Sequence, residues 1–458
     1  MAIRRRRRIG LRTDRVGVAA GRAGAGRWRD RPLAVGLAVL VAYSAWIGFY
    51  LSRHHSALAF VHIGRQFALA GDPPPAIRAA AADRDATDVG YDGQFAYYIA
   101  VDLGGAWRHM DAPAYRYARL GYPLAARLAA LGIAALVPWT MLALNLAAVA
   151  AGAWALAAWL RERGASPWWA LVYGFYPGLF IAVQNDLTEV TAYSLAAVGA
   201  LLLARAGPPT GAAVAGERPA GFRRFVGAGA VFGVAGLSRE TALLFPAVYA
   251  AARALTAWRA PAGSRRRPAM EALALAALGV LPALLWRQVA YAIFGSGGGQ
   301  AEVARVPFGG LLSFLPFEPR EWIEVPAVAL PALLLLVMAV VALLRRAPAE
   351  GPGGGAVALR GGEGVTPARA TGGTGSAELV LVILNALLVV FLQRSSWFSY
   401  YDSGRVSTGL VLAALLALPA LRARLPATRI LWPVVVLLWL SAVPPGLLAP
   451  HAFHALKL

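Results

Sequence analysis

Acidic, basic and aromatic side chains are concentrated in one stretch of the sequence, residues 88–122, which lies between two long apolar runs. The stretch reads DVGYDGQFAYYIAVDLGGAWRHMDAPAYRYARLGY. A carboxylate can take a proton from a hydroxyl group, and an arginine can bind phosphate. Loops of this length without a function are uncommon in compact folds. We therefore place the chemistry of the chain in this stretch.

Part of this stretch resembles a known family. The segment GYDGQFAYYIA, followed by AYRYARLGYPLAARL and a long apolar helix, resembles the first extracytoplasmic loop of GT-C glycosyltransferases. The likeness is to polytopic bacterial membrane proteins distantly similar to the GPI mannosyltransferases. In that superfamily an acid in this loop is the catalytic base on the acceptor, and the sugar donor is a polyprenyl-phosphate lipid. The resemblance implies that Asp92, within YDGQ, is this base.

The position of Asp92 also permits a structural interpretation. Gly93 and the residues after it predict a helix, with Phe95, Tyr98 and Ile99 on one face. Aspartate just ahead of a helix is commonly a cap for the first free N–H groups. Asp92 is therefore either a base or a helix cap on the sequence alone, and the resemblance favours the base.

Composition indicates a polytopic membrane protein. Of the 458 residues, 59% are hydrophobic and only 15% are charged, whereas soluble domains are about 25% charged. The formal net charge is +21, but the basic residues are spread over many loops between apolar runs. This distribution favours membrane topology and contact with anionic lipid over binding of nucleic acid. The chain has no cysteine, which excludes disulfides and thiolate chemistry.

The apolar runs predict an all-α, GT-C-like bundle of about eleven transmembrane helices that occupies residues 32–458. Residues 1–31, with Arg4 to Arg8, are expected to be a basic, disordered cytoplasmic tail. The first run is long for a cleaved signal peptide, so we expect it to be retained. The predicted spans are residues 32–51, 138–160, 167–183, 190–204, 225–237, 241–257, 270–294, 326–344, 379–393, 406–421 and 430–448.

Two connections in this scheme are long. Residues 52–136 form the first external loop, with amphipathic helices expected at 56–70 and 122–131. A membrane crossing at 120–136 is an alternative. The scheme without it is favoured because it places the arginine-rich loops in the cytoplasm. Residues 347–376 are rich in glycine and predict a flexible cytoplasmic linker.

Charged residues gather at the external ends of the predicted spans. The convergent set is Asp92, Asp186, Glu189, Arg239, Glu240, Asp402 and Arg405. Charges are costly at mid-bilayer, so their position at span ends fits a site for a phosphate-containing lipid at the membrane surface. The candidate substrate-binding residues are Tyr91, Gln94, Tyr98, Arg116, Tyr117, Arg119, Asp186, Glu189, Arg239, Glu240, Tyr401 and Arg405.

Each of these candidates has a plainer interpretation that the sequence leaves open. Arg116 and Arg119 either grip phosphate or extend to lipid headgroups. Asp186 and Glu189 either orient the acceptor, or hold a divalent cation, or belong to a solvated turn. Tyr401 lies in a tyrosine-rich loop that suits either sugar stacking or the aromatic belt.

The hypothesis that joins these observations is an inverting hexosyltransferase of the plasma (inner) membrane, with mannose as one candidate sugar. Its partners are a polyprenyl-phosphate sugar, membrane lipids and an unidentified acceptor. A transporter or flippase for a phosphate-containing lipid is the alternative, and a non-catalytic scaffold is a third class. The sequence leaves the need for a metal open. It has no GxxxxGK segment, so we expect no nucleotide cofactor.

The arginine distribution predicts a cytoplasmic amino terminus and an external carboxyl terminus. Reporter fusions at the two ends, one type active only inside and the other only outside the cytoplasm, measure this directly. Both ends on the same side would contradict the odd number of spans.

Overall fold

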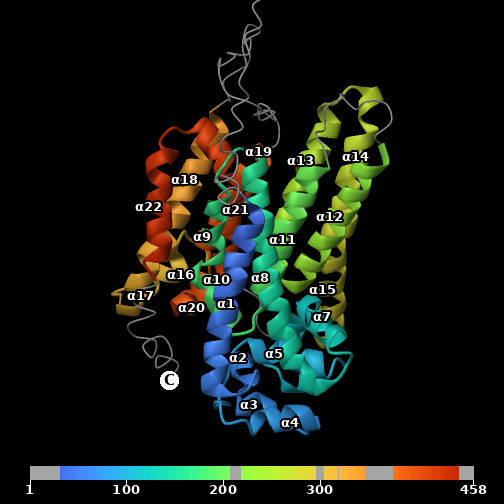
Figure 1. Cartoon of the computed structure of the whole chain (residues 1–458), viewed down its shortest axis with the longest axis vertical. Coiled ribbons are helices and arrows are strands. Elements are labelled where there is room, and N and C mark those ends of the chain that lie inside the picture. Colours follow the sequence, from blue (N-terminus) through green and yellow to red (C-terminus); the bar gives the residue numbers. More distant parts are fainter. Residues whose placement is uncertain (1–30, 207–217, 296–303, 318, 346–374, 443–458) are drawn as a thin grey trace, which may run out of the picture.

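Helices make up every regular element of the residues that the structure describes. The computed structural model describes residues 31–206, 218–295, 304–317, 319–345 and 375–442. The predicted amino-terminal tail up to residue 30, nearly all of the predicted linker and the end of the last predicted span lie outside these ranges. Long helices run alongside one another as a bundle, and short helices gather at one end of it (Figure 1).

Five helical segments of the described residues are long and apolar enough to cross a membrane: Pro32–His54, Ala134–Glu162, Arg266–Phe294, Trp322–Leu344 and Tyr400–Arg424. Two shorter apolar helices, Gly375–Val390 and Thr428–Leu440, accompany them. About 20 helical residues cross a hydrocarbon core of about 30 Å. The chain is therefore an all-α, polytopic membrane protein.

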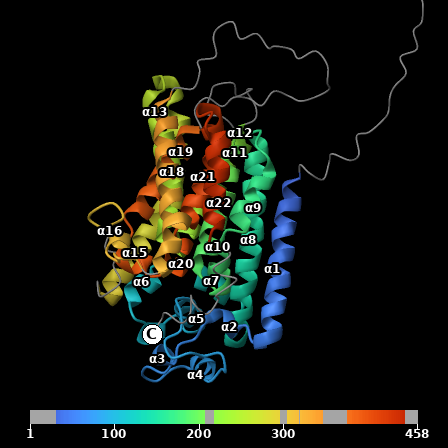
Figure 2. The same cartoon turned by 90° about the vertical axis from the view of Figure 1, so that its left-hand side faces the viewer.

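Each predicted span overlaps one helix or a run of helices. These are α1 (Pro32–His54), α8 (Val137–Glu162), α9 (Ala170–Gly174), α10 (Pro177–Gln184), α11 (Thr188–Arg205), α12 (Arg218–Ser238), α13 (Leu244–Arg259), α14 (Arg266–Ala274), α15 (Leu281–Phe294), α18 (Leu330–Leu344), α19 (Gly375–Val390), α21 (Thr408–Arg424) and α22 (Thr428–Leu440). Shorter pieces are α16 (Gly309–Leu312), α17 (Pro319–Glu324) and α20 (Tyr400–Val406). Helix α1 lies at the edge of the bundle beside α8 (Figure 2).

The predicted span 167–183 is not one helix. It divides into a 3₁₀ turn, Pro167–Trp169, then α9 and α10. The break falls just before Pro177, and Tyr176 there has the extended backbone that a following proline favours. The break brings α10 against α20, where a Cβ atom at Gly178 would lie 2.2 Å from the carbonyl oxygen of Gly404.

The first long connection is itself folded, and we call residues 55–136 the loop domain. Its helices are α2 (Leu58–Val61), α3 (Arg65–Ala68), α4 (Pro75–Ala81), α5 (Gly93–Val101), α6 (Pro113–Tyr117) and α7 (Gly121–Ala129). Its hydrophobic core includes Ile77, Phe95, Tyr98 and Tyr122 and continues into the facing ends of α8 and α15. Arg127 donates to the carbonyl oxygens of Ala100 and Val101, at 2.8 Å each, and so satisfies the end of α5.

The amphipathic helix expected at residues 56–70 is wrong as a single element. The chain leaves the helical conformation at His62, where φ is 54°, and divides into α2 and α3. Gly64 there packs against the backbone of Val89, since a Cβ at Gly64 would lie 2.0 Å from the Val89 carbonyl oxygen. The second expected piece corresponds to α7, which at nine residues is too short to cross a bilayer.

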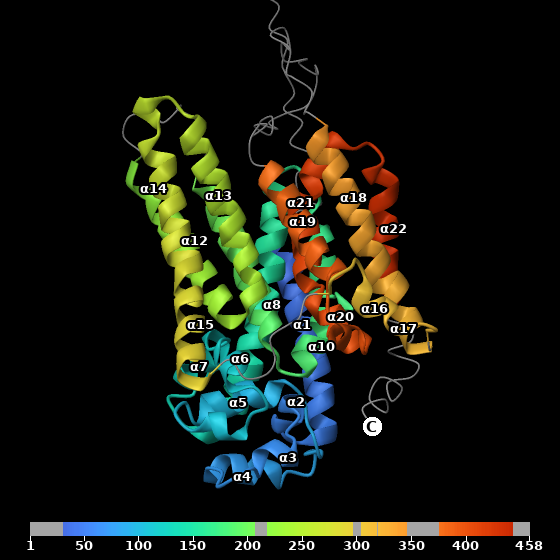
Figure 3. The same ribbon diagram turned by 180° about the vertical axis from the view of Figure 1, so that it is seen from behind.

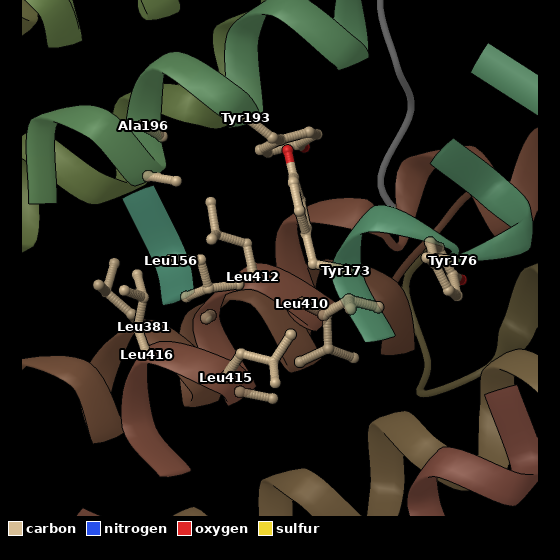
Figure 4. Close-up of a cluster of buried hydrophobic side chains, with 14 of the residues drawn as sticks. Leu156, Tyr173, Tyr176, Tyr193, Ala196, Leu381, Leu410, Leu412, Leu415 and Leu416 are labelled. Carbon is tan, nitrogen blue, oxygen red and sulfur yellow. The ribbon is translucent and has the colours of Figure 1, made fainter. Parts of the chain in front are cut away.

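The main core lies among the bundle helices. Figure 4 shows leucines of α8, α19 and α21 packed with tyrosines of α9 and α11. Two of the buried tyrosine hydroxyls there have side-chain partners, which offsets the cost of their removal from water. Tyr173 lies 3.1 Å from the hydroxyl of Ser194, and Tyr193 lies 2.8 Å from that of Thr241. This core fixes the ends of α10 and α11, from which site residues come.

We predict that Gly93→Ala destabilises the protein. A Cβ atom at Gly93 would lie 2.2 Å from the carbonyl oxygen of Asn185, so the loop domain and the turn before α11 must separate. Overpacking of this kind costs about 1–3 kcal/mol. The measurement is the midpoint of unfolding in detergent. Gly48→Ala in α1 is the control, because a Cβ there meets nothing within 4 Å. Equal midpoints for the two variants would contradict the prediction.

Candidate active site

One pocket opens between the loop domain and the ends of the bundle helices. Its cavity volume is about 30 Å³, well below the range for ligand sites, about 300–1,000 Å³, so a ligand must displace some of the side chains that fill it. Its charged lining consists of Asp92, Asp186, Glu189, Arg116, Arg119 and Arg405. Figure 3 shows α5, α7 and α20, which are among the elements around it, in the lower part of the view. The six charged residues are all candidates named from the sequence.

Asp92 is held by two arginines. It directly precedes α5, and its side chain is 24% exposed. Its Oδ1 lies 3.0 Å from Nη1 of Arg116, and its Oδ2 lies 2.6 Å from Nη2 of Arg405. The side chain makes no capping hydrogen bond to α5, so the ion pairs hold it in place. Burial alone would raise the pKa of Asp92, but the two guanidinium groups lower that pKa well below its usual range. The carboxylate is therefore ionised in this state.

Arg405 joins three carboxylates. Besides Asp92, it contacts Oε1 of Glu189 at 3.0 Å and Oδ1 of Asp402 at 3.2 Å. Glu189 is 1% exposed and also pairs with Arg239 at 2.8 Å. The sequence placed Tyr401 and Arg405 in a loop, and that placement is wrong. Both lie in α20, because the helical run that crosses the bundle already begins at Tyr400.

Arg116 and Arg119 occupy neighbouring turns and have separate acidic partners. Arg119 binds both carboxylate oxygens of Glu240, at 2.9 and 2.7 Å. Arg116 binds both oxygens of Asp111, at 2.9 and 2.8 Å, in addition to Asp92. Arg116 lies 4.2 Å from the ring centroid of Phe95. Carboxylate partners and the aromatic ring hold these guanidinium groups in fixed orientations. Fixed N–H donors suit recognition of an anion.

Asp186 differs from the other carboxylates of the pocket because it contacts no cation among the described residues. Its backbone is left-handed, with φ of 52°, and it is fully buried. Oδ1 accepts hydrogen bonds from Tyr122 at 2.5 Å and from Asn145 at 2.8 Å, whereas Oδ2 has no partner within the described residues. Burial raises the pKa of Asp186 to about 7, against the opposing effect of these two donors. This carboxyl group changes its charge near neutral pH.

The remaining predicted residues lie outside the pocket lining. Tyr91 donates to Asp402 at 2.9 Å, and Gln94 accepts from the backbone N–H of Gly64 at 2.8 Å. Tyr98 donates to Gln94 at 3.0 Å. Tyr117 donates to the carbonyl oxygen of Leu103 at 2.8 Å. These contacts place the first three beside the pocket as supports for α5 and α20, and a direct role in substrate binding stays a prediction.

Several residues of the site were not found from the sequence. Asp111 supports Arg116, Tyr115 contacts the guanidinium group of Arg119, and Tyr122 and Asn145 hold Asp186. Asn145 carried a usable signal, because it is an amide within an otherwise apolar span. Asp111, Tyr115 and Tyr122 carry no such signal in sequence, and their partners become evident only in three dimensions.

The arrangement has the groups for phosphate binding and for proton transfer. Among the described residues no group of three or more acidic, histidine or cysteine side chains is placed to hold a metal ion. Guanidinium groups provide charge-assisted, paired hydrogen bonds to phosphate oxygens. A carboxylate within reach of a hydroxyl group can accept its proton.

Comparisons with known proteins add little. Neither a protein-family model nor a curated protein matches the chain. Among solved structures, the chain is similar to the crystal structure of ArnT from Cupriavidus metallidurans in the apo state. The identity is 13%, over 84% of this chain and 79% of that chain, with a TM-score of 0.33. A likeness with so low a TM-score carries no weight in the proposal below.

We predict that Glu189→Gln destabilises the protein by about 3–5 kcal/mol, because it leaves two buried guanidinium groups without their shared charge. The measurement is the free energy of unfolding in detergent. Glu162→Gln is the matched control, since its pair with Arg205 is partly exposed, at 36% and 41%, and such pairs contribute about 0–1 kcal/mol. A loss in Glu189→Gln no larger than that in the control would contradict the assigned role.

Proposed function

We propose that the chain is an inverting GT-C glycosyltransferase that moves a sugar from a polyprenyl-phosphate donor to a hydroxyl acceptor. One observation carries the proposal. A carboxylate, Asp92, and two arginines, Arg116 and Arg405, meet in one pocket at the end of a membrane bundle. The resemblance of the segment around Asp92 to the first loop of that superfamily supports the same function.

In the proposed reaction the acceptor oxygen attacks the anomeric carbon of the donor sugar. The new carbon–oxygen bond forms as the bond between the anomeric carbon and the phosphate oxygen breaks. The electron pair leaves with the polyprenyl phosphate, whose charge Arg116 and Arg405 stabilise. The acceptor proton goes to Asp92, which acts as the general base.

The donor, the face of the membrane, the sugar and the acceptor are assigned from the chemistry of the pocket and from the distribution of arginine along the chain. A lipid donor suits a pocket at the end of the bundle, because its prenyl chain can remain in the bilayer while the phosphate meets the arginines. Arginine bias favours the external face of the plasma membrane for the pocket. The sugar is taken to be a hexose, with mannose as one candidate. The acceptor is taken to be a glycan, lipid or protein of the cell envelope.

The experiment that tests the proposal is a donor panel. The purified protein is incubated with polyprenyl-phosphate sugars and a membrane extract as the source of acceptor, and donor consumption is followed by mass spectrometry. Release of polyprenyl phosphate that depends on the extract is expected for one donor. Failure of every donor to react, with a protein that binds farnesyl phosphate, would favour the transporter alternative.

We predict that Asp92→Asn lowers turnover by about 100-fold to 10,000-fold, the usual contribution of a general base. Asparagine keeps the size of the side chain, and no helix cap is lost because Asp92 makes none. The control is Asp88→Asn in the same loop, because the side chain of Asp88 is 97% exposed. We expect the turnover of this variant to be nearly that of the wild type. Near-normal turnover in folded Asp92→Asn protein would remove Asp92 from the role of base.

A further inference from the structure

Both oxygens of Asp92 are occupied in this state. Oδ1 contacts Arg116, and Oδ2 contacts Arg405 at 2.6 Å, which is a short ion pair. A general base needs an oxygen within hydrogen-bond reach of the hydroxyl group that it deprotonates. A base held on both sides by guanidinium groups is also weak, because those cations stabilise its ionised form. The resting site is therefore not ready to deprotonate an acceptor.

The donor phosphate requires the same two guanidinium groups. Arg405 also has a buried Nε without a hydrogen-bond partner among the described residues, so it retains a donor for an incoming anion. Arg116 and Arg405 are the arginines of the pocket that contact Asp92. A phosphate bound to both would therefore compete with the Asp92 carboxylate.

We propose that the donor phosphate displaces the Asp92 carboxylate from Arg116 and Arg405, so that donor binding itself frees the base. The inference rests on the proposed function for its choice of anion. It assigns the phosphate subsite to these two arginines, and it makes binding ordered, with the donor ahead of acceptor activation.

The other contacts of the two arginines permit this exchange. Arg405 remains anchored by Glu189 and Asp402, and Arg116 remains anchored by both oxygens of Asp111. Neither guanidinium group needs to move when Asp92 leaves. The exchange replaces one anion by another, so no buried cation is left unpaired at any stage. Once free of the two cations, the Asp92 carboxylate regains a more ordinary basicity.

The exchange is tested by binding of farnesyl phosphate, a short polyprenyl monophosphate, to the full chain in detergent. In the wild-type protein the ligand must break the two ion pairs of Asp92, whereas in Asp92→Asn those two pairs are absent and the guanidinium groups keep only their other carboxylate partners. We expect Asp92→Asn to bind farnesyl phosphate at least about tenfold more tightly than the wild type. Farnesol, which has no phosphate, is expected to bind equally to both.

Asp88→Asn is the matched control, because it removes one negative charge from the same loop outside the pocket and should leave the affinity unchanged. Arg405→Gln should weaken binding. Equal or weaker binding of farnesyl phosphate by Asp92→Asn would overturn the proposal. If Asp92→Asn does not fold, Asp92→Ser carries the same expectation.

A structure with farnesyl phosphate bound gives a direct second measurement. We expect the phosphate on Arg116 and Arg405, with Asp92 beyond ion-pair distance, about 4 Å, from both. Phosphate bound elsewhere, or beside an undisturbed Asp92, would also overturn the exchange. Neither binding measurement uses a sugar or an acceptor. An active enzyme that shows no exchange therefore contradicts this inference and leaves the proposed function in place. Exchange without sugar transfer contradicts the proposed function and leaves the phosphate subsite on Arg116 and Arg405.

Discussion

The site depends on the guanidinium group of Arg405. Its three carboxylate partners come from the loop domain, from α11 and from α20. Buried ion pairs tolerate little error in position, because removal of one partner leaves an unpaired charge away from water. The position of α20 against α11, and of the loop domain against both, is therefore fixed by electrostatics as well as by packing.

Close backbone contacts make these ion pairs possible. Gly93 brings the start of α5 against Asn185, and Gly178 brings α10 against Gly404, one residue from Arg405. A side chain at either glycine would separate the elements that carry Asp92 and Arg405. The charged network thus relies on residues that carry no functional group of their own.

The helices of the bundle could be predicted from the sequence because apolar runs and arginine bias report directly on membrane insertion. The break before Pro177 and the left-handed turn at His62 were missed, although proline carried a usable signal for the first. The predicted ends of the spans placed Asp92, Glu189, Arg239 and Arg405 on the same side of the membrane.

Hydropathy carries no information on which acid pairs with which arginine. The pair of Asp92 and Arg405 joins residues 313 positions apart, and only the packed bundle brings them together. Asp111 and Tyr122 were missed for the same reason.

The loop domain shares a hydrophobic core with the ends of α8 and α15. It is also tied to the bundle by hydrogen bonds such as that from Trp286 to the carbonyl oxygen of Tyr117, at 2.7 Å. The wall of the pocket that carries Asp92 and Arg116 is thus already ordered before any ligand arrives. A ligand that binds a preformed wall loses little free energy to the ordering of the chain. The binding entropy measured by calorimetry should therefore come mainly from the ligand and from released water, with little contribution from ordering of the loop domain.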